Sequence, residues 1–169
     1  MRGTLRVLQA AVRHDVGTFI FGSSSSVYGA SNTVPFSEEQ PTDRPLSPYA
    51  ASKIAAEALC HTWHHLYSLS VICLRFFTVY GPRQRPDLAI NRFVRLMRAG
   101  EAVPQYGDGS SLRDYTYVAD IVRGVVAALE LPADYEVINL GGDAPVSLAE
   151  LIRLVAEALG VEPRVEVLP

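Results

Sequence analysis

The chain has 169 residues, of which 49% are hydrophobic and 20% are charged, an ordinary composition for one globular domain with a sizeable core. Its net charge of −3 gives no basic surface, so we expect neither nucleic acid nor a membrane as partner, and a few placed arginines must recognise any phosphate. The two cysteines lack a partner motif, and neither a signal peptide nor a membrane-spanning run is recognisable, so we expect a cytoplasmic protein.

Apolar periodicity and the positions of Gly and Pro predict helices that alternate with short buried strands. The first half is expected to hold a helix over 4–15, a strand over 18–21, an irregular loop over 29–48, a helix over 49–67 and a strand over 71–77. The second half is expected to hold helices over 90–99 and 118–129, strands over 135–140 and 164–168, and short extended pieces beside residues 107–109. Ser147 and Glu150 have the spacing of a capping box that opens a last helix ending at residue 159. This alternation predicts an α/β fold with a mainly parallel sheet.

Tyr49 and Lys53 are four positions apart at the start of a predicted helix, so they share one helix face. The hydroxyl of a free tyrosine loses its proton only at about pH 10. A neighbouring ammonium and the positive helix N-terminus both favour the phenolate. A hydroxyl among the serines at 23–26, at the end of the preceding strand, is suited to relay a substrate proton. The pattern therefore indicates an acid–base site. An alternative stays open, in which the serines are turn residues and Tyr49 is an aromatic residue at a helix start.

Five segments in order along the chain resemble the extended short-chain dehydrogenases/reductases that act on nucleotide sugars, the NAD-dependent epimerase/dehydratase family. They are FIFGSSSSVYG (19–29), PYAASK (48–53), RFFTVYGPR (75–83), RDYTYVAD (113–120) and YEVINLGG (135–142). A lone YxxxK spacing is weak, whereas five ordered motifs are strong. The resemblance implies a partial Rossmann-like parallel sheet with the Ser/Tyr/Lys site over 1–80. A mostly nucleotide-sugar-binding α/β portion, interleaved with the sheet, is implied over 81–169.

The resemblance also implies a role for each site residue. Tyr49 is the catalytic base, Ser24 is the catalytic hydroxyl, and Lys53 holds the nicotinamide ribose of NAD and tunes Tyr49. Tyr49 and Phe76 are further expected to contact the cofactor. The residues expected to bind a UDP-sugar are Ser25, Thr78, Arg85 and Arg113. For Arg113 we expect phosphate contact, and the alternative is a surface ion pair with Asp114.

The serine run favours one reaction of this family over another. Related 4,6-dehydratases have Thr-Asp-Glu where this chain has Ser24 to Ser26, so no acid is present to protonate a leaving hydroxyl. The chain therefore resembles the 4-epimerases, which oxidise C4, rotate the keto sugar and return hydride to the other face; a dehydratase or another sugar-nucleotide reductase remains the alternative. Thr78 and Arg85 resemble the UDP-glucuronate pattern, in which these positions hold the sugar carboxylate, although an exposed Arg85 without a ligand stays open.

The family's glycine-rich turn, Gly-x-x-Gly-x-x-Gly, is not formed by any of the 12 glycines, so we expect weak NAD binding by this chain alone. Three interpretations stay open: a fragment of a larger epimerase, a short form that acts with a partner, and a non-catalytic module for UDP-sugar binding or oligomerisation. His61 and His65 share a helix face, but no third ligand has metal-site spacing, so no metal is expected. The helices over 4–15 and 49–67 resemble the pair that forms the family's dimer interface, so we expect a homodimer.

Overall fold

The computed structural model describes residues 1–30 and 33–169, so that two residues of the loop predicted over 29–48 lie outside the described residues. The chain forms two compact units, and neither of them is continuous in sequence. Unit 1 comprises Met1–Phe77 and Ala119–Leu140, and unit 2 comprises Thr78–Val118 and Gly141–Pro169. The predicted division into a Rossmann-like portion with the Ser/Tyr/Lys site over 1–80 and a mostly nucleotide-sugar-binding portion over 81–169, interleaved with the sheet, stays a prediction.

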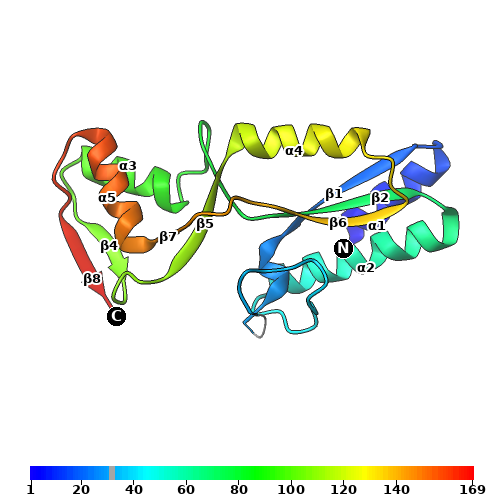
Figure 1. The fold of residues 1–169 in the computed structure, drawn as a ribbon, viewed down its shortest axis with the longest axis horizontal. Coiled ribbons are helices and arrows are strands. Elements are labelled where there is room, and N and C mark those ends of the chain that lie inside the picture. Colours follow the sequence, from blue (N-terminus) through cyan, green and yellow to red (C-terminus); the bar gives the residue numbers. More distant parts are fainter. Residues whose placement is uncertain (31–32) are drawn as a thin grey trace. The chain divides into compact units, whose positions relative to one another are not determined.

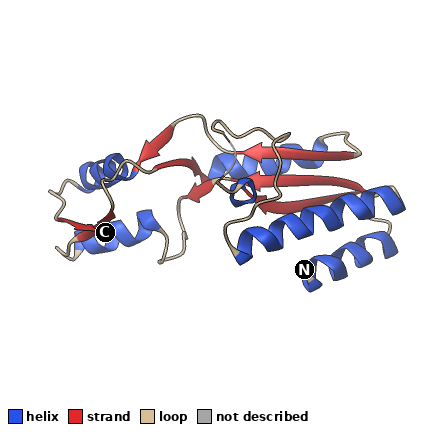
Figure 2. Ribbon diagram, turned by 90° about the horizontal axis from the view of Figure 1, so that it is seen from below, coloured by secondary structure: helices blue, strands red, loops and turns tan. Residues whose placement is uncertain are grey.

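Unit 1 is a parallel sheet covered by helices on both faces (Figures 1 and 2). Its strands are β1 (Thr18–Ser24), β2 (Ser70–Phe76) and β6 (Tyr135–Leu140), in the order β1-β2-β6 and all parallel. The helices α1 (Arg2–Arg13) and α2 (Pro48–Tyr67) pack on one face, and α4 (Val118–Glu130) packs on the other. A 3₁₀ turn, η1 (Ser25–Tyr28), follows β1 directly. The predicted α/β fold with a parallel sheet is confirmed.

The central strand β2 shows why the unit holds together. Val71 and Cys73 point into the cluster formed with α1 and α2, whereas Ile72 and Leu74 point into the cluster formed with α4. All four side chains are fully buried, as expected for a strand with helices on both faces. The uninterrupted apolar run in the sequence therefore reflects two different cores, one on each side of the same strand.

Ser47 and Ser147 cap the N-termini of two helices. The Ser47 side chain accepts from the backbone N of Ala50 at 3.1 Å, and Pro48 occupies the first turn of α2. Ser147 likewise accepts from the backbone N of Glu150 at 3.1 Å, which confirms the predicted cap of α5 (Leu148–Leu159). The carboxylate of Glu150, however, accepts from Arg153 instead of closing the second half of the predicted capping box.

Unit 2 is built from short strands and two helices. The strands β3 (Thr78–Tyr80), β5 (Leu112–Tyr117) and β7 (Pro145–Ser147) form one sheet, in which β3 and β5 are parallel and β5 and β7 antiparallel. A second, parallel pair joins β4 (Val103–Tyr106) and β8 (Val165–Leu168). Apolar residues of β4, α3 (Ala89–Arg98) and α5 form the core of this unit. Among the described helices, none has both the length and the apolarity that a membrane span requires.

Candidate active site

The serine cluster lies where β1 ends and η1 begins. Ser24 is the last residue of β1, and its Oγ accepts from the backbone N and from the Oγ of Ser26, at 3.2 and 3.0 Å. Ser23 is buried and donates to a carboxylate of α2, while Ser25 is half-buried at the start of η1. The predicted catalytic hydroxyl of Ser24 therefore lies at the carboxyl end of a parallel strand, where open α/β sheets build their sites. The catalytic role of Ser24 and the substrate contact of Ser25 remain predictions.

Tyr49 and Lys53 occupy the first two turns of α2, beside the end of β1. The Tyr49 side chain is 55% exposed. The Nζ of Lys53 donates to the backbone O of Gly22 at 2.8 Å and lies 5.5 Å from the centroid of the Tyr49 ring. Because Gly22 precedes Ser24 by two positions in β1, the lysine ties the start of α2 to the strand that ends in Ser24. The structure thus brings these three predicted catalytic residues to one end of the unit 1 sheet.

Phe76 ends β2 and pairs in register with Ser24 across the sheet. Its ring belongs to the apolar cluster on the α4 side, together with Ile20 and Leu140. A Cβ added at Gly22 would lie 3.2 Å from the Phe76 ring, so the ring packs closely against the β1 backbone at this position. The predicted contact of Phe76 with a cofactor is not tested by this packing and remains a prediction.

In unit 2, Thr78 begins β3 and Arg85 lies in the turn that follows this strand. Thr78 is half-buried and pairs with Tyr115 of β5. The Arg85 side chain is 73% exposed, and its Nε and Nη2 donate to the two carboxylate oxygens of Asp87 at 3.1 and 2.8 Å. These hydrogen bonds from Arg85 lower the pKa of the Asp87 carboxyl. Arg85 therefore binds the carboxylate of Asp87 through two hydrogen bonds, and its predicted contact with a sugar carboxylate remains a prediction.

Arg113 is an exposed residue near the start of β5. The alternative of a surface pair with Asp114 is not what the structure describes. Within residues 1–30 and 33–169 the ion pairs do not include these two side chains. The Oδ1 of Asp114 instead accepts from Thr116 Oγ1 at 3.1 Å and from the backbone N of Gly142 at 3.0 Å. The phosphate contact predicted for Arg113 remains a prediction.

The histidines of α2 make packing contacts. His61 and His64 lie 4.9 and 5.6 Å from the Tyr135 ring, measured between ring centroids, and His64 Nδ1 lies 3.0 Å from the backbone O of Leu69. Among the residues that the structure describes, no group of three or more His, Cys, Asp or Glu is arranged to hold a metal ion.

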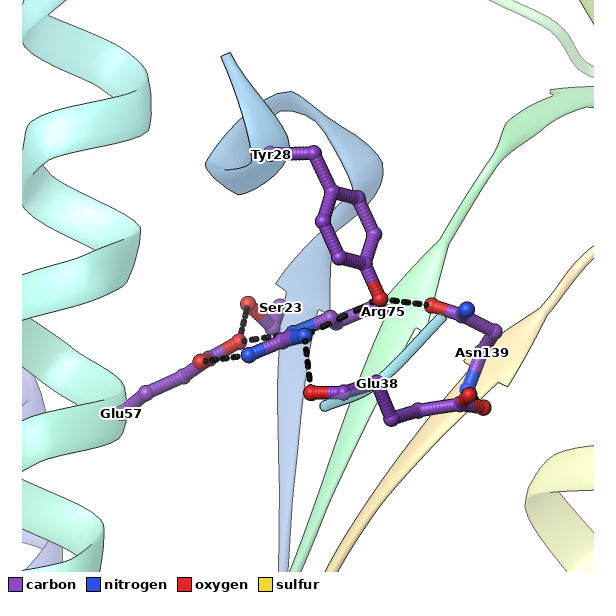
Figure 3. Close-up of polar contacts among 6 residues, drawn as sticks. All are labelled: Ser23, Tyr28, Glu38, Glu57, Arg75 and Asn139. Carbon is purple, nitrogen blue, oxygen red and sulfur yellow. Dashed lines mark hydrogen bonds and ion pairs between the residues drawn. The ribbon is translucent and has the colours of Figure 1, made fainter. Parts of the chain in front are cut away.

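Sequence analysis missed two residues beside the site, Glu57 of α2 and Arg75 of β2, which form a buried ion pair (Figure 3). Two signals were available. Arg75 interrupts an apolar strand, and Glu57 follows Lys53 by four positions, so it lies on the same helix face as Lys53 and Tyr49. Charged residues are rarely buried unless paired, so an arginine in such a strand calls for an acidic partner.

The chain is similar to proteins of known family. Residues 1–141 match the NAD dependent epimerase/dehydratase family. The chain is 42% identical over 167 residues to the UDP-glucuronate 4-epimerase of Thermodesulfobacterium geofontis. The matched region covers 98% of this chain and 51% of that protein. A UDP-glucuronic acid 4-epimerase from Bacillus cereus, solved with UDP-glucuronic acid and NAD, is 39% identical, with a TM-score of 0.90 over 98% of this chain and 52% of that one.

A second solved structure is a UDP-N-acetylglucosamine 4-epimerase from Methanobrevibacter ruminantium, in complex with UDP-N-acetylmuramic acid. It is 30% identical, with a TM-score of 0.95 over 99% of this chain and 55% of that one. The chain thus spans about half the length of the relatives that it matches. The fold is shared with these enzymes, and the chain belongs to the NAD-dependent epimerase/dehydratase family.

Proposed function

We propose that this chain carries the acid–base residues and the sugar-nucleotide contacts of a UDP-sugar 4-epimerase, with UDP-glucuronate as the preferred substrate. The observation that supports the proposal most directly is the bond from Lys53 Nζ to the backbone O of Gly22. This bond fixes the helix that bears Tyr49 against the strand that ends in Ser24. The proposed base, the ammonium of Lys53 and the proposed relaying hydroxyl of Ser24 therefore lie at the same end of the sheet.

The proposed chemistry assigns one task to each residue. Tyr49, as phenolate, takes the proton of the sugar C4 hydroxyl, and Ser24 hydrogen-bonds the same oxygen and relays the proton. Lys53 stabilises the phenolate through its charge. When the configuration at C4 has inverted, the Tyr49 hydroxyl returns the proton to the C4 oxygen. Because Tyr49 is 55% exposed, a ligand can approach this residue from solvent.

The residues present fit the nicotinamide end of NAD. An ammonium has several N–H donors, and Gly22 takes one of those of Lys53, so others remain for the ribose hydroxyls. Tyr49 and Phe76 would complete this contact. NAD, when bound, supplies the hydride acceptor and donor for C4. The glycine-rich turn for its pyrophosphate is not found in the sequence, so we propose that this chain holds the nicotinamide side only.

For the sugar nucleotide, we propose that unit 2 supplies the contacts that select the substrate. Arg113, exposed near the start of β5, suits the diphosphate, and Thr78 and Arg85 suit the C6 carboxylate of a hexuronic acid. The pair of Arg85 with Asp87 supports this choice, because it shows this guanidinium in a fork geometry with a carboxylate. A sugar carboxylate would replace Asp87, and the replacement is easy because both side chains are exposed.

The identity of the product tests the proposal. We would assay a chimera in which this chain replaces the matching part of the T. geofontis relative, with NAD and UDP-glucuronate, and separate the products by chromatography. The expected product is the C4 epimer of the substrate. A 4-keto-6-deoxy sugar, from a neutral hexose, would support the dehydratase alternative. Binding of UDP-glucuronate by calorimetry without any conversion would support the non-catalytic alternative.

We also propose that the chain forms a homodimer through α1 and α2, in the cytoplasm. Apolar side chains of these helices are left exposed, namely Val7 at 55%, Leu66 at 61% and Tyr67 at 53%. Cys60 and Cys73 are both free and buried, as suits a reducing compartment. Sedimentation equilibrium should show a dimer that Leu66→Glu converts to a monomer, and a monomeric parent chain would contradict the proposed interface.

A further inference from the structure

A row of polar residues crosses the unit 1 sheet one position before its carboxyl end. Ser23 of β1 pairs in register with Arg75 of β2, and Arg75 pairs with Asn139 of β6. Residues in register on neighbouring strands point to the same face, so the three side chains form one polar row. The next row holds Ser24 and Phe76, two of the predicted site residues. The polar row therefore lies one residue before Ser24 and Phe76 along the strands, next to the proposed active site.

The row is joined to α2 by a buried ion pair (Figure 3). Arg75 donates from Nη2 and Nε to the two carboxylate oxygens of Glu57, at 2.8 and 3.1 Å, and these side chains are only 5% and 9% exposed. The hydroxyl of Ser23 donates to the same carboxylate at 2.5 Å. Burial alone would lower the pKa of Arg75, but the hydrogen bonds with Glu57 and Tyr28 raise it above its ordinary value. Arg75 therefore keeps its positive charge beside the Glu57 carboxylate.

The other side of Arg75 holds the segment that follows η1. Its Nη1 donates to the hydroxyl oxygen of Tyr28 at 3.0 Å and to the backbone O of Glu38 at 3.3 Å. The Tyr28 hydroxyl donates to Asn139 Oδ1 at 2.7 Å, and the backbone N of Asn139 donates to Glu38 Oε1 at 2.7 Å. The Tyr28 ring also stacks on Phe36, with centroids 4.6 Å apart. One guanidinium thus connects helix α2, the η1 turn and Glu38 (Figure 3).

The spacing along α2 links this network to the proposed chemistry. Tyr49, Lys53 and Glu57 follow one another at intervals of four positions, so they lie on one helix face. Lys53 binds the backbone of Gly22, and Glu57 binds the side chain of Ser23, the next residue of β1. Two consecutive residues of the strand are therefore attached to the helix that bears the base, immediately before Ser24.

We infer that Glu57 is a positioning residue, which acts through Ser23 and Arg75 to hold Ser24 and residues 36–38 in register with Tyr49 and Lys53. The inference rests on the proposed function for its consequence in catalysis, but its geometric part concerns this chain alone. If the pair served stability only, any replacement that restores stability would also restore the site. If it positions the site, a replacement that restores stability without the polar contacts would leave the site loosened.

The test uses a double variant, Glu57→Leu/Arg75→Met, because apolar residues of similar volume often replace a buried ion pair without loss of stability. Arg75→Lys is the conservative single variant, which keeps the charge but cannot reach Glu57, Tyr28 and Glu38 together. Arg153→Lys is the matched control, because it makes the same change in an exposed network with Glu150 and Glu157. Global stability is measured by urea unfolding, and local order by amide hydrogen exchange of the chain without ligand.

We expect amides 24–28 and 36–38 to exchange at least about tenfold faster in both pair variants, while amides of Val71–Leu74 keep their protection and Arg153→Lys changes nothing. In the epimerase chimera, kcat should fall about tenfold or more with little change in KM, because misplaced proton-transfer groups slow chemistry more than binding. Unchanged exchange in a folded double variant would overturn the inference. If the double variant does not fold, unchanged exchange in Arg75→Lys would overturn it equally. Because the exchange measurement needs neither substrate nor cofactor, its result is independent of whether the proposed function holds.

Discussion

Two arginine–carboxylate pairs, one in each unit, have nearly the same geometry and opposite surroundings. Glu57–Arg75 in unit 1 and Asp87–Arg85 in unit 2 both form a fork with donor–acceptor distances of 2.8 and 3.1 Å. The side chains of the first pair are 5% and 9% exposed, whereas those of the second are 73% and 64% exposed. Distance alone therefore does not tell what such a pair does.

The difference in burial indicates a different role for each pair. Removing one member of a buried pair leaves an uncompensated charge in a medium of low polarity, so the partners are fixed to each other. An exposed pair is screened by water and can exchange its carboxylate for that of a ligand with little loss. We therefore interpret Arg75 as part of the scaffold behind the acid–base site and Arg85 as a guanidinium available to a substrate.

The largest difference should appear in stability. Glu57→Ala should lower the free energy of unfolding by about 3–5 kcal/mol, because the Arg75 guanidinium is then buried without its partner. Asp87→Ala, the matched change in the exposed pair, should leave the midpoint of urea unfolding almost unchanged. If both variants lowered the free energy of unfolding by similar amounts, burial would not explain a difference between the two pairs.

The second difference concerns ligand binding. Arg85→Ala should weaken the binding of UDP-glucuronate about thirtyfold and that of UDP-glucose far less, because only the former has a C6 carboxylate. Arg113→Ala should weaken both, since both ligands share the diphosphate. Calorimetry measures each affinity without turnover. Equal losses for the two sugars in Arg85→Ala would favour a neutral hexose as the substrate.

A smaller effect should follow when the internal competitor of the sugar carboxylate is removed. Asp87→Asn keeps the size of the side chain but removes its charge, so Arg85 no longer has to release a carboxylate. The affinity for UDP-glucuronate should then rise by up to about fivefold, with no change for UDP-glucose. A loss of affinity for UDP-glucuronate would mean that Asp87 orients Arg85 for the ligand instead of competing with it.

The smallest effect is a change in titration. The Asp87 pKa is lowered in the folded chain, chiefly by its hydrogen bonds from Arg85. This contribution to stability is therefore present above the ordinary carboxyl pKa and is lost as the pH falls through the lowered value. In Arg85→Ala, the Asp87 pKa measured by NMR should rise toward its ordinary value. An unchanged pKa would show that the pair does not form in solution.

The sequence predicted the long elements better than the short ones, for a physical reason. α2 and β2 have a clear period and a defined start, so local signals suffice. β1 was expected to end at residue 21, but it continues to Ser24 because its last residues pair with Leu74, Arg75 and Phe76 of β2. The three-residue strands β3 and β7 likewise depend on pairing with β5, which no local pattern reveals.

The candidate site shows the same limit. Tyr49 and Lys53 were found because their spacing has a direct chemical meaning within one helix. Glu57 and Arg75 were missed because their meaning depends on a contact between a helix and a strand, 18 positions apart in the chain. The asparagine that completes the network is farther still, since Asn139 and Tyr28 are 111 positions apart. The sequence signals at Arg75 and Glu57 mark unusual positions, but which residues they bind becomes clear only when the fold is known.

The central proposal is that unit 1 supplies acid–base chemistry through Tyr49, and the most direct test is Tyr49→Phe in the epimerase chimera. This change removes only the oxygen that moves the proton and keeps the ring. Turnover of UDP-glucuronate should fall by about a thousandfold or more, while its dissociation constant, measured by calorimetry, should change by less than about twofold. Near-normal turnover, or a loss of binding as large as the loss of turnover, would contradict the assignment of Tyr49 as the base.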